Sequence, residues 1–363
     1  MGRETGDGVT FLFVTYGLFL LPFHFGKRLA ASRQVYIFIL SILFLFSAFR
    51  FEVGCDWAGY FYQYLGAEAR LLMLSADARE PLWWAILYLL NTQYIPYPVS
   101  NVISSAIFFF GIHILARRQP NPLAFLVILF PVLIINMPMS GIRQGAAIGL
   151  FCIAIVSFID KRPIRFTFWI LVATGFHSSA AIFLILLPLA TGAYTKSRIA
   201  LALLLAVPGV FMLASGDSAE IAIDRYVGTG VDAAGAAFRV GVLVLSGLFF
   251  FLFLRKAWRF KFPDDFAVAH LFSMAMIFLI AVVPVSSVIG DRLGYYFIPA
   301  QAMIFARIPY LNIGNRQLVS ALPYLGLTLM FTTWVALSSH FNQCYIPYKS
   351  WLLGFPNSVW SGL

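Results

Sequence analysis

The chain consists of long apolar stretches separated by short gaps that hold almost all of its charge. Sixteen of the 25 Lys and Arg residues fall in six of these gaps with only three acidic residues, while the other gaps hold nine basic and twelve acidic residues. An apolar stretch of about 20 residues crosses the hydrocarbon core of a bilayer as a helix. Positive charge collects on the cytoplasmic side of such spans. The alternation therefore predicts a multi-pass membrane protein and gives each span a direction.

Composition supports this class. Charged residues make up 11% and hydrophobic residues 61% of the 363 residues, whereas a soluble domain carries about 25% charge. The apolar runs are continuous rather than alternating in period two, which favours helices over a β-barrel. We expect an all-α, polytopic membrane protein with roughly ten to twelve spans, forming a single domain over 1–363. The net charge of +10 is spread beside the spans and does not indicate nucleic-acid binding.

The stretches expected to cross the membrane lie between alternately basic and acidic gaps. On this pattern the loops 50–80 and 215–238 face the outer side, together with both termini. The first stretch lacks a small-residue cleavage site, so we expect it to be a retained span rather than a signal peptide. The predicted spans are Thr10–Phe25, Val35–Phe49, Val99–Ala116, Pro122–Met137, Gln144–Ile159, Ile199–Ala214, Val240–Leu254, Phe266–Ser286, Leu293–Ala306 and Gln317–Ala336.

Two segments break the alternation. Phe166–Ala190 has basic gaps on both sides and a polar run, GFHSS, at its middle. Two half-helices that meet at this run and return to the same side explain both facts, because irregular backbone at depth is tolerated where it lines protein or a wet cavity. One long tilted span is the alternative. Pro81–Asn91 is too short to cross, and we expect a re-entrant or interfacial helix with Trp83 and Trp84 at headgroup level.

Three arginines lie where the orientation rule disfavours positive charge, on the outer side: Arg50, Arg143 and Arg292. Arg143 has no carboxylate within sixteen residues along the chain. It is either a snorkelling side chain that binds lipid phosphate or a clamp for a diphosphate, since a guanidinium fork matches phosphate oxygens in a bidentate manner. Arg292 follows Asp291, so a local ion pair is the alternative to a substrate contact there.

Further candidates lie near these arginines in the sequence. Glu52 and Asp56 share a face if their segment is helical, and such a pair can act as a base or bind sugar hydroxyls. A solvated loop is the alternative. His177 lies at the predicted chain reversal between the two half-helices, where a polar cavity is expected, although a lone histidine in an apolar run is more often a packing residue.

The three cysteines show no metal-ligand spacing along the sequence. Cys152 lies inside an apolar run and is expected to be a small packing residue. Cys55 and Cys344 both fall in outer segments; a disulfide can form there, but the sequence favours two free thiols.

The ordered set of short motifs resembles the EpsG/Wzy group of bacterial polysaccharide polymerases. Arg143-Gln144 followed by the FHSS run is the most specific part of the resemblance, which extends from residue 50 to residue 348. The matching pieces are Arg50–Asp56 (RFEVGCD) with Tyr60, Glu80–Leu82 (EPL), Ile142–Ala147 (IRQGAA), Ala173–Ala180 (ATGFHSSA), Asp291–Leu293 (DRL) and Tyr345–Tyr348 (YIPY). Cys55 departs from the small polar residue usual at its position in the first motif.

The resemblance implies a GT-C-like membrane glycosyltransferase that acts at the outer face of the bacterial inner membrane. It would move a growing glycan from undecaprenyl diphosphate to a sugar hydroxyl of the next lipid-linked repeat, with inversion. No cofactor or metal is expected, because guanidinium groups can stabilise the leaving diphosphate. Membrane lipids and a chain-length-regulating membrane protein are the other expected partners. The catalytic candidates are His177, Arg143 and Arg292, and the candidate substrate contacts are Arg50, Glu52, Asp56, Glu80, Gln144, Asp291 and Tyr295.

Three other functions fit the class of protein. An O-antigen ligase uses the same donor, but ligases usually carry a larger late outer loop than 215–238. A transporter of lipid-linked sugars favours charges buried in mid-span and two related halves, neither of which the sequence shows. A membrane acyltransferase with His177 as base needs a second catalytic group near that histidine, and none is evident.

Overall fold

The structure is a computed structural model that describes residues 32–68, 80–192, 195–202, 204, 235–284 and 286–354. Within these ranges all regular elements are helices, and the extended pairing is limited to an isolated bridge between Arg50 and Ser350. Four of the described helices are long and apolar enough to cross a membrane. The prediction of an all-α, multi-pass membrane protein is confirmed. The predicted span Thr10–Phe25 and most of Ile199–Ala214 lie outside the described residues.

Contacts between residues divide the chain into two compact units. Unit 1 contains Met1–Gly149, Gly175–His177 and Ala321–Leu363, and unit 2 contains Leu150–Thr174 and Ser178–Ser320. Three of the four boundaries along the chain fall inside helices, and the fourth lies between His177 and Ser178.

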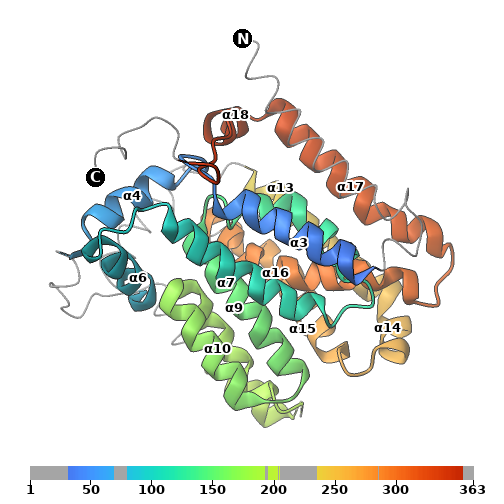
Figure 1. The fold of residues 1–363 in the computed structure, drawn as a ribbon. Helices are drawn as coiled ribbons and strands as arrows, with labels where there is room; N and C mark the ends of the chain where they lie inside the picture. Colours follow the sequence, from blue (N-terminus) through green and yellow to red (C-terminus); the bar gives the residue numbers. More distant parts are fainter. Residues whose placement is uncertain are drawn as a thin grey trace. The chain divides into compact units, whose positions relative to one another are not determined.

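Unit 1 is built around α3 and α7, which pack along each other (Figure 1). A Cβ atom on Gly111 of α7 would lie 1.8 Å from the carbonyl oxygen of Gly149 in α9, so these helices approach at a pair of glycines, as membrane helices commonly do. The elements of unit 1 are α3 (Arg33–Ala48), α4 (Trp57–Leu65), α6 (Pro81–Thr92), α7 (Val99–Ala116), α8 (Pro122–Leu129), the π-helical η1 (Phe130–Ile134), the start of α9 (Ile142–Ile159), the end of α17 (Arg316–Leu337) and α18 (Ser339–Tyr345).

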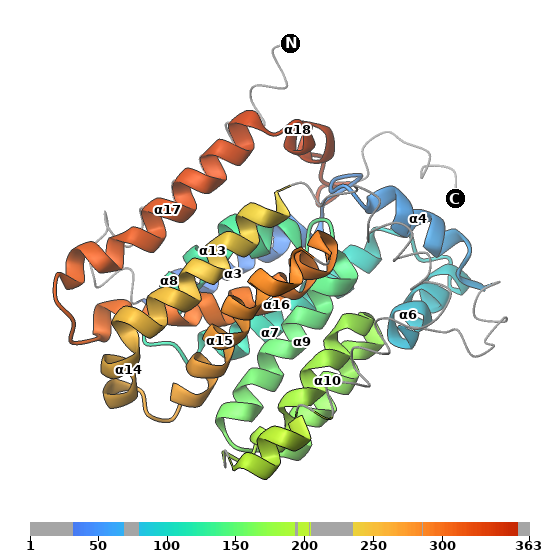
Figure 2. The ribbon, with the colours of Figure 1, turned by 180° about the vertical axis from the view of Figure 1, so that it is seen from behind.

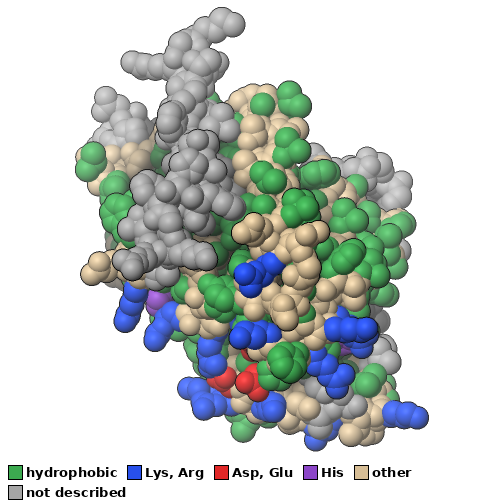
Figure 3. Space-filling model, turned by 90° about the vertical axis from the view of Figure 1, so that its right-hand side faces the viewer, with side chains coloured by type: hydrophobic (Ala, Val, Ile, Leu, Met, Phe, Trp, Pro, Cys, Tyr) green, Lys and Arg blue, Asp and Glu red, His purple; other side chains and the backbone are tan. Residues whose placement is uncertain are grey.

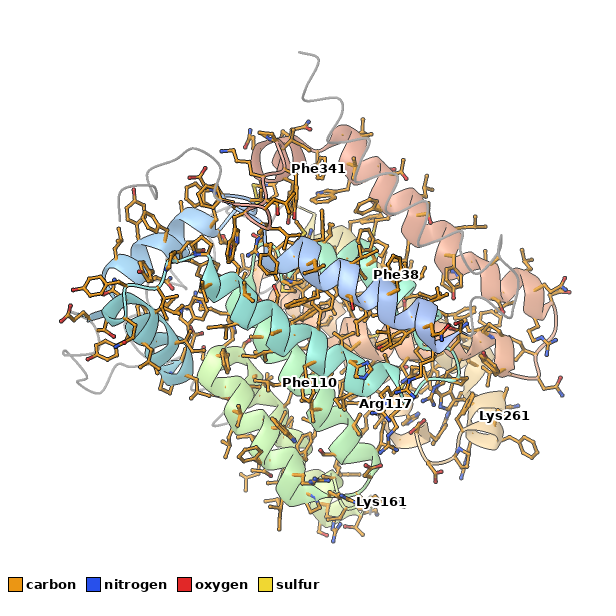
Figure 4. The ribbon with its side chains drawn as sticks, in the orientation of Figure 1. Phe38, Phe110, Arg117, Lys161, Lys261 and Phe341 are labelled. Carbon is orange, nitrogen blue, oxygen red and sulfur yellow. A yellow bond between two sulfur atoms is a disulfide. The ribbon has the colours of Figure 1, made fainter. Side chains whose placement is uncertain are left out.

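The outer faces of these helices carry large apolar side chains. Phe38 of α3 and Phe110 of α7 point away from the protein (Figure 4) and are 63% and 58% exposed. Exposed phenylalanines at such positions are suited to contact lipid chains. The interior holds smaller polar side chains, among them Ser47 and Ser105, whose hydroxyls are 3.1 Å apart.

Unit 2 contains three helices, α13, α15 and α16, that pack side by side (Figure 2). A Cβ atom on Gly247 would lie 2.6 Å from the carbonyl oxygen of Ser273, so α13 and α15 also meet at a glycine. The elements of unit 2 are the end of α9, α10 (Pro163–Phe176), the 3₁₀-helical η2 (Ser178–Leu189), α13 (Ala236–Phe249), the π-helical η3 (Phe250–Leu254), α14 (Arg255–Lys261), α15 (Phe266–Val282), α16 (Ser287–Arg307), η4 (Ile308–Tyr310) and the start of α17.

One end of unit 2 is rich in basic and aromatic side chains. Arg307 is 1% exposed, forms an ion pair with Asp265, and stacks over the rings of Trp258 and Phe262 at 5.5 and 4.7 Å. The Lys and Arg side chains of α14 are exposed, and Figure 3 shows exposed Lys and Arg side chains on the face that it draws. Such clusters are typical of the cytoplasmic ends of membrane helices.

The segment Phe166–Ala190 reverses direction as predicted. The 14 residues of α10 span about 21 Å at 1.5 Å per residue, and the 12 residues of η2 span about 24 Å at 2.0 Å per residue. A Cβ atom on Gly192, just after η2, would lie 3.0 Å from Cε of Lys161, just before α10. The two halves therefore form a hairpin of nearly equal arms whose ends meet, and the alternative of one long tilted span is wrong.

Two details of the sequence-based account are corrected. The short helix at Pro81 is confirmed as α6, but Trp83 and Trp84 are only 1% and 7% exposed. They pack against tyrosines of α4 rather than toward lipid headgroups. Cys55 and Cys344 form a disulfide, so the expectation of two free thiols is wrong. The two residues are 289 positions apart in the sequence, which gives no sign that their Cα atoms lie 4.7 Å apart. Cys152 is a buried free thiol, as expected.

Candidate functional site

The loop that carries the RFEVGCD motif is held by a buried arginine. Arg50 is 2% exposed, and its guanidinium donates to the backbone oxygens of Val53 and Ser47 at 3.2 and 2.6 Å and to Oδ1 of Asn101 at 3.0 Å. Burial lowers the pKa of Arg50, while the surrounding tyrosines oppose that change. All three nitrogens of the guanidinium donate to protein oxygens. Arg50 therefore shapes the site and does not offer a pair of unused N–H groups to a ligand.

The C-terminal YIPY segment lies against the same loop. The backbone amide of Gly54 donates to the carbonyl of Cys344 at 2.7 Å, and that of Phe51 donates to Lys349 at 2.9 Å. Glu52 forms an ion pair with Lys349 at 2.9 Å. Residues 50–56 form a loop rather than a helix, which is the second of the two alternatives, and each carboxylate has a different partner.

Gly54 brings the loop against the segment that precedes Arg143. Its φ is +99°, and a Cβ atom there would lie 1.9 Å from the carbonyl oxygen of Met139. Only glycine fits this close approach. Next to it, the hydroxyl of Ser140 donates to Oδ2 of the exposed Asp56 at 3.3 Å. The contacts place Asp56 at the start of the IRQGAA motif.

Arg143 lies at the centre of this region. Its Nη1 donates to Oε2 of Glu80 in a direct ion pair, and its guanidinium carbon lies 5.5 Å from the ring centroid of Tyr60. Among the described residues, its buried Nε has no hydrogen-bond partner. Burial raises the pKa of Tyr60, and the charge of Arg143 opposes the rise. Glu80 and the ring of Tyr60 thus orient the guanidinium of Arg143, and its Nε makes no hydrogen bond to the described residues.

Glu80 is held in an unusual backbone conformation. Its φ and ψ are +66° and +53°, although it precedes Pro81, which restricts the preceding residue toward extended conformations. Glu52 also has a positive φ of +53°. Non-glycine residues in this region cost about 1–3 kcal/mol each and cluster at functional sites. Two of the predicted substrate-contact carboxylates are thus among the five non-glycine residues with positive φ in the described part of the chain, together with Tyr94, Lys161 and Asn315.

The turn that carries His177 contacts the same part of unit 1. A Cβ atom on Gly175 would lie 2.7 Å from Cδ1 and Cγ of Leu82, two residues beyond Glu80. His177 is half-buried and lies between the end of α10 and the start of η2. The EPL motif therefore joins the arginine on α9 to the histidine turn, and Gln144 is buried beside Arg143 in sequence.

Unit 2 holds the DRL motif. Asp291 accepts a bidentate pair from Arg239, with Nε to Oδ1 at 2.7 Å and Nη2 to Oδ2 at 2.8 Å. The same guanidinium lies 5.7 Å from the ring centroid of Tyr295, whose side chain is buried. Arg292 is exposed. Asp291 thus takes its bidentate partner from α13, and adjacent residues on a helix point to different faces.

Ser179, the last residue of the FHSS run, contacts α16 within unit 2. The hydroxyl of Ser179 donates to the phenol oxygen of Tyr296 at 3.1 Å. Tyr296 packs between the rings of Phe151 and Phe183 at 5.5 and 5.0 Å. This contact fixes η2 against α16.

A family model described as the EpsG family matches residues 33–350, which is most of the chain. The chain belongs to the EpsG family. A search of curated proteins and a search of solved structures gave no match. Membership of the EpsG family points to a polysaccharide-polymerase type of role, and it agrees with the motifs that the sequence placed in order.

Sequence reasoning on this EpsG family member missed three site residues. Arg239 lies at the end of an acidic loop and resembles an ordinary juxtamembrane charge, and Lys349 lies near the C-terminus. From the sequence, Tyr60 is named only as part of the family resemblance, and its contact with the Arg143 guanidinium is not predicted. Charge balance gave no signal for the ion pairs of Lys349 and Arg239, because Arg50 and Arg292 lie close to Glu52 and Asp291 in the sequence.

Proposed function

We propose that this EpsG family protein polymerises lipid-linked oligosaccharide repeat units. The donor is a growing glycan on undecaprenyl diphosphate, and the acceptor is a sugar hydroxyl of the next lipid-linked unit, at the outer face of the bacterial inner membrane. The observation that carries the proposal is the joining of three family motifs in unit 1: Glu80 pairs with Arg143, and Leu82 of the same motif contacts the turn that carries His177.

Arg143 is suited to bind the diphosphate. Its ion pair with Glu80 and its stacking on Tyr60 fix the plane of the guanidinium, and the side chain is 27% exposed. A fixed guanidinium stabilises charge on a leaving diphosphate without a change in its own protonation. Glu80 neutralises this charge when no ligand is bound, so the incoming diphosphate competes with a carboxylate.

The chemical step is a displacement at the anomeric carbon. The acceptor oxygen forms a bond to that carbon, the bond to the diphosphate oxygen breaks, and the diphosphate leaves with the electron pair. His177 is the proposed base that takes the proton of the acceptor hydroxyl, since an imidazole titrates near neutral pH. Direct displacement inverts the anomeric centre. Asp56 is exposed and is the second candidate base, whereas Glu52 is occupied by Lys349.

In unit 2, Arg292 is the candidate for a further contact to the lipid-linked substrate. Asp291 and Tyr295 of α16 both contact Arg239 of α13. These contacts fix α16, the helix that carries Arg292, against α13. The roles of Asp291 and Tyr295 are accordingly to position α16 rather than to touch sugar.

The test is incubation of the purified protein in liposomes with its lipid-linked repeat unit, without nucleotide or added metal, followed by a gel for glycan length. A ladder of products is expected. A verified substrate that yields no ladder contradicts the proposal. Transfer to lipid A-core indicates a ligase instead, and movement of intact substrate across the bilayer indicates a transporter.

A further inference from the structure

The disulfide that joins Cys55 to Cys344 lies beside a histidine. Nε2 of His340 is 3.0 Å from Sγ of Cys55. Within the described residues, Cys55, His340 and Cys344 form a group whose potential ligand atoms all lie within 4.8 Å of one another. Two thiolates and an imidazole are the ligand types that zinc prefers.

The three potential ligands come from helix α18 and from the loop that carries Cys55. His340 and Cys344 are four residues apart on α18, so they project from the same face of one helix turn. Cys55 follows Gly54, whose positive φ and close approach to Met139 fix the course of the loop. Two ligands at i and i+4 on a helix, completed by one from a distant loop, are a common arrangement for a metal site.

The two segments stay together without the sulfur–sulfur bond. The amide of Gly54 donates to the carbonyl of Cys344, the amide of Phe51 donates to Lys349, and the phenol of Tyr345 donates to the carbonyl of Ile135 at 3.2 Å. Reduction therefore leaves both thiols and the imidazole near one another. His340 is exposed and both cysteines are half-buried, so a metal ion can enter and a water molecule can fill a fourth position.

We propose that Cys55, His340 and Cys344 bind one zinc ion in the reduced protein, and that the disulfide is the oxidised state of the same site. A dithiol reductant supplies two electrons and two protons to the disulfide and becomes a disulfide itself. Zinc then displaces both thiol protons and is held by two thiolates and the neutral imidazole. In either state the RFEVGCD loop is tied to α18.

The experiment uses the full-length protein in detergent. A phosphine reduces the disulfide, the phosphine oxide taking its oxygen from water, and the protein is desalted without air and titrated with Zn²⁺ alone. Bound metal is counted by atomic emission after gel filtration. We expect one zinc per chain in the reduced protein and none in the oxidised protein. Titration with Co²⁺ should give the thiolate-to-metal absorption band of a sulfur-ligated ion.

Variants separate this site from adventitious binding. H340A should still form the disulfide in air but should lose zinc affinity by more than about 100-fold, since loss of even an outer-shell partner costs about 10–100-fold. Cys344→Ser should remove binding. The controls are Asn342→Ala, an exposed neighbour on α18, and Cys152→Ser, the buried free thiol. Reduced protein that takes up no zinc and shows no cobalt band, or H340A with the affinity of the wild type, overturns the proposal.

Discussion

Arg143 donates from Nη1 to the carboxylate of Glu80, 63 residues earlier in the chain, while its guanidinium faces the ring of Tyr60. The pair joins the start of α9 to the strained turn that begins α6. The Arg143 side chain is still 27% exposed, and this exposed part of the guanidinium is what the proposed diphosphate contact requires.

Arg143→Ala should lower the rate of polymerisation by about 10²- to 10³-fold, the usual cost of removing one donor to a developing negative charge. Arg143→Lys should restore only part of the rate, because an ammonium lacks the bidentate fork. The measurement is ladder formation by purified protein at equal amounts. Arg162→Ala, an exposed arginine just beyond the other end of α9, is the matched control and should keep the full rate.

Asp291 and Arg292 should behave differently although they are adjacent. The Asp291–Arg239 pair is bidentate and partly buried, so Asp291→Ala and Arg239→Ala should both lower the thermal midpoint, with a coupling of about 0.5–3 kcal/mol in a double-mutant cycle. Arg292→Ala should leave the midpoint unchanged and reduce polymerisation. Equal loss of thermal stability in Asp291→Ala and Arg292→Ala would show that Arg292 is structural.

The close approach at Gly54 makes a clear packing prediction. Gly54→Ala should destabilise the protein by at least about 2 kcal/mol, because the new Cβ atom overlaps the Met139 carbonyl and φ is positive. Gly59→Ala, five residues later with no atom within 4 Å of its Cβ position, should stabilise α4 by about 0.5–1 kcal/mol. Thermal unfolding in detergent compares the two. Equal midpoints would mean that the loop does not lie on Met139.

The sequence predicted the positions of most described helices because helices depend on local patterns. Val99–Ala116 begins and ends as predicted, and the chain reversal at His177 followed from basic gaps on both sides of one apolar run. The partners of the ion pairs could not be predicted from local sequence patterns. Arg143 meets Glu80 and Asp291 meets Arg239 across 63 and 52 residues, and such partners are selected by helix packing, not by spacing.

The hairpin of α10 and η2 predicts the sidedness of its flanks. In a Cys152→Ser background, Lys161→Cys and Lys196→Cys should react with the same membrane-impermeant thiol reagent from the cytoplasmic side of vesicles, since the flanks meet at Gly192. The disulfide keeps the other two cysteines from reacting. Labelling of the two positions from opposite sides would mean that this segment spans the membrane.

The most direct test of the central claim is the affinity of a short polyprenyl diphosphate for the wild type, Arg143→Ala and Glu80→Gln. Removing the competing carboxylate in Glu80→Gln should tighten binding by about 10- to 100-fold, since a hydrogen bond to a charged group is worth about 1.5–3 kcal/mol. Arg143→Ala should bind far more weakly than the wild type. Both variants retaining the wild-type affinity would contradict the assignment of Arg143 as the diphosphate site.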